Sequence, residues 1–175
     1  MTYDDFQHIV FERKPDGVLL ATLNRPEFMN ATNARLHFEL TRIWGVVSDD
    51  PSVKVVVVTG AGDRAFSAGG DLNWVAEMVG QPEQIATLQK EAADLVYNLL
   101  ACDKPVISAI NGTAVGAGLA VALLADISIM AEEARIKAAG GADVNVKADP
   151  SGATPMHMAA LAGNADIINV LADAK

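Results

Sequence analysis

The longest uncharged stretch of the sequence lies between Lys104 and Asp126 and contains 21 residues. About 20 apolar residues can cross a bilayer as a helix, so length alone permits a membrane span. The interior of the stretch argues against one. Residues 105–110 (PVISAI) are strand-like, Asn111-Gly112 is a turn signal, and the glycine-rich segment after it opens a helix. With a further strand expected over 127–130, this order of elements predicts an α/β fold.

Other segments supply the remaining elements of this fold. Residues 8–14 and 17–24 are β-like runs joined by Pro15-Asp16-Gly17, so we expect a hairpin. Val53–Thr59 is β-branched and nearly all apolar, which favours a strand buried on both faces. Helices are expected from a cap at Asn30 or Thr32 to about Val47, from a cap at Asp71 to about Val79, and from Pro82 to about Cys102. The first helix has helically spaced apolar residues at Leu36, Leu40, Ile43, Trp44 and Val47.

Charge and cysteine content exclude several classes of function. The chain has 13 Lys and Arg against 22 Asp and Glu, giving a net charge of −9, which argues against non-specific nucleic-acid binding. Its single cysteine, Cys102, can form neither an intrachain disulfide nor a multi-cysteine zinc site, and no metal-ligand cluster is visible. The first residues, MTYDDFQH, lack the apolar stretch of a signal peptide. We therefore expect a cytoplasmic protein without a metal or membrane segment.

Two glycine-rich loops each connect an expected strand to the start of an expected helix. The first is 65–72 (AFSAGGDL) and the second is 110–119 (INGTAVGAGL). Each places backbone N–H groups at a helix N-terminus, where the groups lack intrahelical acceptors and glycine permits close approach. Two such groups converging on one oxygen form an oxyanion hole, and loss of one donor costs about 2.7–4 kcal/mol of transition-state stabilisation.

Together with 23–31 (LNRPEFMNA), these loops resemble the crotonase (enoyl-CoA hydratase/isomerase) superfamily over about residues 6–136. The resemblance implies a spiral of ββα repeats that binds acyl-CoA thioesters, with coenzyme A as part of the substrate and no separate cofactor. It implies that the backbone amides of Gly70 and Ala117 stabilise the oxyanion. The residues it assigns to substrate and CoA binding are Arg25, Phe28, Met29, Ala68, Asp71, Leu72 and Asn73.

The sequence also departs from the family pattern. Hydratases of the family carry a glutamate where this chain has Ala120, and a second glutamate lies in a segment that we do not find after Ile136. Hydration needs a base to activate water and an acid to protonate carbon, and alanine supplies neither. We therefore expect a truncated spiral with impaired turnover, and whether the chain is an enzyme stays open. Glu77, Glu91 and Asp126 are interpreted as solvated or strand-edge carboxylates rather than substitutes.

The C-terminal segment resembles a single ankyrin repeat, an all-α helix–turn–helix. Its features are 141–145 (GADVN), 152–160 (GATPMHMAA) and a glycine turn before a second apolar helix. His157 in this pattern is interpreted as structural. We therefore expect two parts, a crotonase-like part at 1–137 and an ankyrin-like repeat at 138–175, joined near 136–139.

Two alternatives to an acyl-CoA protein remain open. A lone repeat cannot bury its stacking faces, so the segment at 138–175 could act as an interaction module or promote self-association. The chain could also be a chimera or engineered sequence without catalytic activity. All nine aromatic residues precede residue 98, which fits two sequences of different origin as well as a small-residue functional region.

Overall fold

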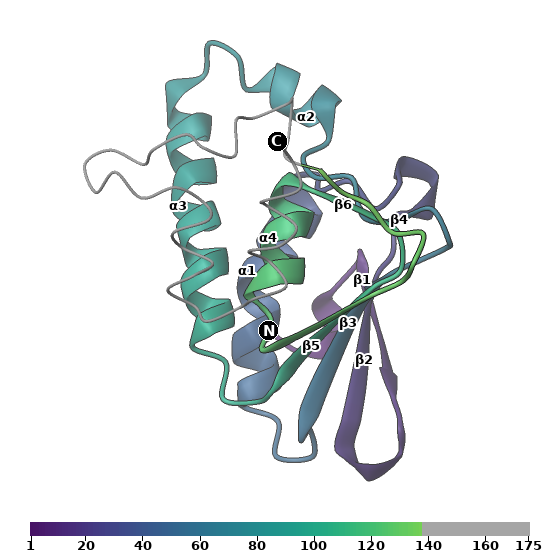
Figure 1. Cartoon of the computed structure of the whole chain (residues 1–175). Helices are drawn as coiled ribbons and strands as arrows, with labels where there is room; N and C mark the ends of the chain where they lie inside the picture. The colour runs from purple at the N-terminus through teal and green to yellow at the C-terminus, as the bar shows by residue number, and fades with distance from the viewer. Residues whose placement is uncertain (138–175) are drawn as a thin grey trace, which may run out of the picture. The chain divides into compact units, whose positions relative to one another are not determined.

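A computed structural model describes residues 1–137 of the chain (Figure 1). The ankyrin-like repeat expected at 138–175 lies outside the described residues. The strands are β1 (Ile9–Arg13), β2 (Val18–Leu23), β3 (Val55–Gly60), β4 (Ala65–Ser67), β5 (Val106–Ile110), β6 (Thr113–Val115), β7 (Ile127–Met130) and β8 (Ile136–Lys137). The α-helices are α1 (Ala34–Ser48), α2 (Leu72–Glu77), α3 (Pro82–Leu100) and α4 (Gly116–Leu124). Short 3-10 turns cover Tyr3–Asp5, Pro15–Gly17 and Pro26–Phe28.

The expected N-terminal hairpin is confirmed. β1 and β2 pair antiparallel, with Ile9 opposite Leu23 and Arg13 opposite Leu19. Both strands are one residue shorter than the predicted runs at each end, and at the inner ends Lys14 and Gly17 belong to the turn. Asp16 adopts a left-handed conformation with φ of 61°, which aspartate tolerates better than most residues.

Helix α1 begins later than the sequence indicated. Its cap is Asn33, whose side chain accepts a hydrogen bond from the backbone N–H of Leu36, so the predicted caps Asn30 and Thr32 are wrong. Asn30 is instead fully buried with φ of 54°, and Thr32 forms a β-bridge with Gly70. The five apolar positions predicted for this helix are all buried, which confirms the face it presents to the core.

The main sheet has five strands in the order β1-β2-β3-β5-β7, and β2, β3, β5 and β7 run parallel. In β3 the residues alternate between half-buried and buried, starting at Val55. The expectation of a strand buried on both faces is therefore met in full on one face only, since the other face is half-buried. The strand itself and its place inside the sheet are confirmed.

The parallel strands are arranged as successive ββα units. β3 leads to β4 and then to α2 and α3, and β5 leads to β6 and then to α4. The second strands of these units pair parallel in a three-stranded sheet, β4-β6-β8. The predicted α/β class and the repeat implied by the family resemblance are thus present. The segments of β4 and β6 were predicted as loops, so the second sheet was not expected.

The uncharged stretch after Lys104 folds into β5, a turn, β6 and α4, and β7 follows Asp126. The predicted strand, turn, helix and following strand are confirmed, and β6 is the element that was not expected. Helix α4 has nine residues, and none of the helices within residues 1–137 is long and apolar enough to span a membrane. The expected cap at Asp71 and the proline at the start of α3 are confirmed. α2 and α3 each end about two residues earlier than predicted.

Helices α1, α3 and α4 lie side by side and cover the main sheet, as Figure 1 shows. The core between them is built on Trp44 of α1 and on Phe66 of β4, both fully buried. α3 contributes Leu95 and Leu99, and α4 contributes Val121 and Ala122. α4 also packs directly on β4 and β6 of the second sheet, which positions the loop at its N-terminus.

A surface cluster at the end of α1 makes the stability of the fold sensitive to acid. The Asp50 carboxylate accepts hydrogen bonds from the Ser52 hydroxyl (2.6 Å) and backbone N–H (2.9 Å) and from the Arg13 guanidinium (2.7 Å). The Ser52 hydroxyl, and then the guanidinium, hold the pKa of this carboxyl well below its ordinary value of 3.8.

We therefore expect acid to destabilise the fold in part through Asp50. The unfolded carboxyl takes up a proton near pH 4 while the folded one remains ionised, so the free energy of unfolding falls as pH decreases below about 4. Urea unfolding at pH values between 2 and 5 should show a shallower fall for Asp50→Asn than for the unmodified chain. Equal slopes for the two proteins would contradict the assignment.

Candidate active site

The two glycine-rich loops meet backbone to backbone. Gly69 has φ of 85°, and a Cβ placed on it would lie 2.9 Å from the carbonyl oxygen of Val115. Gly116 has φ of 53°, and a Cβ there would lie 3.5 Å from the Gly69 Cα and 3.9 Å from the Gly70 nitrogen. Glycine is therefore favoured at both positions by the left-handed backbone conformation, and at Gly69 it is also required for space. The structure brings together the two loops that the sequence singled out.

The first loop is held so that the Gly70 N–H faces away from Thr32, its neighbour in an isolated β-bridge. The Thr32 N–H donates to the Gly69 carbonyl (2.6 Å), and the Asp71 N–H donates to the Thr32 carbonyl (2.9 Å). The Gly69 carbonyl and the Gly70 N–H belong to one trans peptide and point in opposite directions, so the Gly70 N–H points away from Thr32. Gly70 is exposed, and its N–H has no acceptor among the described residues.

The second loop leads directly into α4, of which Ala117 is the second residue. The first four N–H groups of a helix have no intrahelical acceptor, and the helix dipole adds partial positive charge there. Gly118 is buried against β4, where a Cβ would lie only 2.3 Å from the Cβ of Ser67. The absence of a side chain at Gly118 thus allows the start of α4 to approach the first loop.

Arg25 joins the upstream motif to the first loop. Its guanidinium donates to the Ala31 carbonyl, forms an ion pair with Asp71 (3.2 Å) and lies over the Phe28 ring at 4.7 Å. Only 6% of Arg25 is exposed. The side chain therefore positions the segment around Asp71, a role that the sequence pattern did not reveal.

The other predicted binding residues lie at the surface, in the same segments as Arg25 and Asp71 or next to them. Phe28 and Met29 are 52% and 39% exposed, and the Met29 carbonyl accepts a hydrogen bond from the Ala68 N–H (3.0 Å). Leu72 is 82% exposed at the start of α2, beside the exposed Asn73. All seven predicted binding residues thus belong to the upstream motif, the first loop or the start of the helix that follows it.

Two asparagines have roles that the sequence reading missed. The Asn30 side chain accepts from the Arg25 N–H (3.0 Å) and donates to the carbonyls of Ala61 and Ala65 (both 2.9 Å). Asn111 bonds both backbone groups of Gly60, at 3.0 and 2.8 Å. Each side chain links segments distant in sequence, and the only sequence signal was a capping or turn propensity.

The carboxylates considered as substitutes for the family glutamates have other surroundings. Glu91 contacts the buried His37, with 2.9 Å between Oε2 and Nδ1. Asp126 accepts a hydrogen bond from the Val106 N–H (2.8 Å), and Glu77 is exposed. Ala120 is half-buried on α4. Residues 1–137 contain no group of three His, Cys, Asp or Glu side chains placed to hold a metal ion.

Comparison with known proteins decides the family. The family model described as enoyl-CoA hydratase/isomerase matches residues 13–149, more than half of the chain. The chain belongs to the enoyl-CoA hydratase/isomerase family. The match begins inside β1, includes both glycine loops and ends beyond the junction expected near 136–139.

Curated relatives in this family include hydratases of acyl-CoA compounds. The chain is 43% identical over 118 residues to 2,3-dehydroadipyl-CoA hydratase of Escherichia coli K12, covering 67% of this chain and 44% of that protein. It is 32% identical over 131 residues to crotonyl-CoA hydratase of Syntrophomonas wolfei, covering 74% of this chain and 49% of that protein. The chain therefore spans about half the length of the curated relatives it matches.

Solved structures of enoyl-CoA hydratase/isomerase family members have the same fold. An enoyl-CoA hydratase/isomerase from Mycobacterium paratuberculosis superposes with a TM-score of 0.75 and 32% identity, covering 94% of this chain and 66% of that one. An enoyl-CoA hydratase from Bacillus anthracis gives a TM-score of 0.75 with 29% identity, covering 95% and 62% of the two chains. These likenesses support the crotonase-like α/β fold expected from the sequence.

Proposed function

We propose that the chain binds acyl-CoA thioesters and stabilises a thioester oxyanion with the backbone amides of Gly70 and Ala117. The single observation that carries the proposal is the direct backbone contact between the two loops at Gly69 and Gly116. It brings the exposed Gly70 N–H close to the N-terminus of α4, to which Ala117 belongs. Fixed donors at such a position stabilise developing negative charge without reorganisation.

The CoA portion of the substrate is assigned to the surface next to these amides. The ion pair between Arg25 and Asp71 holds the first loop in place. Phe28 and Met29 offer exposed apolar surface, and Ala68 lies next to Met29, to whose carbonyl its N–H donates. Leu72 and Asn73 extend this surface along the start of α2. Coenzyme A enters as part of the substrate, and the proposed chemistry requires no metal.

Hydratase turnover is proposed to be impaired, because the site amides can polarise a carbonyl but cannot transfer protons. Ala120 occupies the position of the family glutamate on α4, and alanine cannot act as acid or base. Glu91 and Asp126 are engaged by His37 and by a backbone N–H. Binding and polarisation of a thioester can persist without these groups, since backbone amides do not depend on side-chain identity.

Thermal-shift titration with CoA and crotonyl-CoA tests the proposal. At 100 times the dissociation constant, a ligand that binds only the folded state adds about 2.7 kcal/mol, which corresponds to a rise in Tm of about 5–10 °C. Both ligands should raise the Tm, and crotonyl-CoA should raise it further because its carbonyl contacts the amides. No shift at millimolar concentrations of either ligand would overturn the binding proposal.

A pair of variants at one position separates the thioester contact from CoA binding. Ala117→Pro removes the backbone N–H at a position in the first turn where a helix tolerates proline, whereas Ala117→Ser keeps it. The extra stabilisation by crotonyl-CoA over CoA should disappear in the first variant and persist in the second.

Measurable hydration of crotonyl-CoA by the unmodified chain would contradict the proposal that its hydratase turnover is impaired.

A protein-interaction role for the segment at 138–175 is a second candidate. The sequence observation that favours it is the GATPMHMAA pattern at 152–160, typical of a repeat that stacks on other repeats. Under this candidate, residues 1–137 and 138–175 form separate parts. Removal of 138–175 should then change the oligomeric state measured by light scattering.

A further inference from the structure

Helix α2 leaves one apolar side uncovered immediately after the Gly70 donor. Leu72, Val75 and Val79 are 82%, 43% and 80% exposed. Val79 follows the last residue of α2, and its N–H donates to the Ala76 carbonyl (3.2 Å), so the chain is still helically wound there. Residues three and four apart lie on one side of a helix, and these three side chains therefore form one stripe, the α2 stripe. Apolar side chains that gather on an exposed surface indicate a binding surface, whereas scattered ones do not.

The opposite side of α2 is packed against the core, which fixes the direction of the α2 stripe. The Trp74 ring lies 5.6 Å from the ring of His37 on α1. Met78, one turn further along the chain, is only 4% exposed. The α2 stripe is therefore on the side of α2 that faces away from α1.

The α2 stripe is continuous with the proposed oxyanion donor. A Cβ placed on Gly70 would lie 3.4 Å from Cγ2 of Val75, so these two residues are in van der Waals range. The stripe begins at Leu72, which belongs to the proposed CoA surface, and leads away from it along the chain. Val79 lies about 6 Å beyond Val75 along the helix axis. A thioester held at the Gly70 N–H therefore has the stripe beside its acyl chain.

The surroundings of the α2 stripe contain no cation. Residues 65–89, which form the first loop, α2 and the start of α3, include no Lys or Arg, and neither do residues 105–134 around the second loop. The charged residues within 65–89 are acidic: Asp71 is engaged in its ion pair, whereas Glu77 and Glu83 are exposed and pair with no described residue. A carboxylate at the far end of an acyl group would lack a counter-ion there and would meet like charges, which selects against it.

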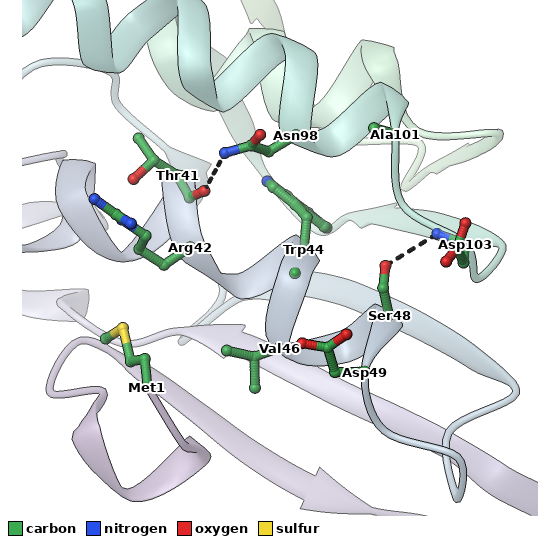
Figure 2. A pocket seen from close by; sticks show the side chains of 11 residues that line it. Met1, Thr41, Arg42, Trp44, Val46, Ser48, Asp49, Asn98, Ala101 and Asp103 are labelled. Atoms are coloured by element: carbon green, nitrogen blue, oxygen red, sulfur yellow. Dashed lines mark hydrogen bonds between the residues drawn. The ribbon is translucent and has the colours of Figure 1, made fainter.

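A cavity of about 400 Å³ between α1 and the C-terminal end of α3 is the other place to consider for an apolar chain (Figure 2). Gly45 lines it, together with the charged residues Arg42, Asp49 and Asp103. None of the described residues that line it belongs to α2, α4 or either glycine loop. This cavity is therefore not continuous with the proposed donors, in contrast to the α2 stripe.

We propose that the acyl group of the thioester is an unsubstituted aliphatic chain that lies along Val75 and Val79. This inference rests on the proposed function, because the Gly70 N–H fixes where the chain begins. The separation of Val75 and Val79 suits a chain of about six carbons. The α2 stripe thereby defines the substrate class, since it accepts an aliphatic acyl group and rejects one that ends in a carboxylate.

Calorimetric titration of the full chain at neutral pH with CoA, hexanoyl-CoA and adipyl-CoA tests the inference. The two acyl groups have the same number of carbons, but only the adipyl group ends in a carboxylate. Hexanoyl-CoA should bind at least tenfold more tightly than adipyl-CoA. Equal binding of the two thioesters would overturn the inference and leave the proposed function standing. Absence of binding by CoA and by both thioesters would overturn the proposed function and the inference with it.

A matched pair of variants locates the acyl group on the α2 stripe. Val79→Lys supplies a cation at the far end of the stripe, at an exposed position, and should raise the affinity for adipyl-CoA at least tenfold while weakening hexanoyl-CoA binding. Val10→Lys makes the same change at a position that is 49% exposed on β1, the strand at the opposite edge of the main sheet from β7. It should leave both affinities unchanged. An unaltered preference for hexanoyl-CoA in Val79→Lys, or equal effects of the two variants, would refute the placement on the α2 stripe.

Discussion

Gly118→Ala is expected to lower the free energy of unfolding by about 3 kcal/mol, the upper part of the range for inserting a methyl group into a packed interior. The new Cβ would lie 2.3 Å from the Cβ of Ser67 and 3.0 Å from its carbonyl oxygen. Ser67 cannot easily yield, because it is fully buried in β4 and its hydroxyl donates to the Asn30 carbonyl at 2.8 Å. Either α4 or β4 must therefore move.

The same substitution should disturb the proposed active site. The Ser67 hydroxyl also accepts a weak hydrogen bond from the Gly69 N–H (3.3 Å), so displacement of Ser67 reaches the loop that carries Gly70. We expect the rise in Tm caused by crotonyl-CoA to be lost together with stability.

Gly45→Ala is the matched control for Gly118→Ala. It makes the same chemical change in another helix, at an exposed position with nothing within 4 Å of the new methyl group. It should raise the free energy of unfolding by about 0.5–1 kcal/mol. Urea unfolding of the two variants measures the contrast, and equal stabilities would show that the contact between α4 and β4 is looser than described.

Glu39→Ala is expected to lower the free energy of unfolding by about 3 kcal/mol, because it removes a buried acceptor that three partly buried donors share. The Glu39 carboxylate is fully buried on α1 and accepts from the backbone N–H groups of Gln7 (2.6 Å) and His8 (2.9 Å). It also pairs with the Arg35 guanidinium at 2.7 Å. Its loss should release the segment that leads into β1 and leave three donors without a partner.

Asp94→Ala provides the comparison for Glu39→Ala. Asp94 pairs with Lys90 at 2.7 Å with the same i, i+4 spacing, but 77% of the lysine and 40% of the aspartate side chain are exposed. Exposed pairs of this kind contribute under about 1 kcal/mol. Similar losses in the two variants, measured by urea unfolding, would indicate that the Glu39 carboxylate is solvated in solution.

The elements of the fold were predictable where their signal is local. Periodic apolar residues gave the face of α1, and the Pro-Asp-Gly turn gave the hairpin. The cap of α1 was misplaced because Asn30, Thr32 and Asn33 are all capping residue types within four positions. Only the folded structure shows that the Asn30 side chain donates to the carbonyls of Ala61 and Ala65 and therefore does not cap the helix.

The second sheet was missed for a related reason. β4 and β6 have three residues each, too few to show an alternating pattern, and they stand among glycines that suggest loops. They are strands because they pair with each other, and β6 pairs with β8 as well. Pairing between distant segments leaves no periodic signal in either segment alone.

The sequence by itself determined the α/β class, the family and the two loops whose glycines permit close approach. The tertiary structure decided that Gly69 meets Gly116, that Arg25 is buried against Asp71, and that a cavity lies beside Gly45. The physical reason is the range of the interactions. Propensity, periodicity and capping depend on neighbouring residues, whereas close approach, burial and ion pairing depend on which distant segments the folded core places together.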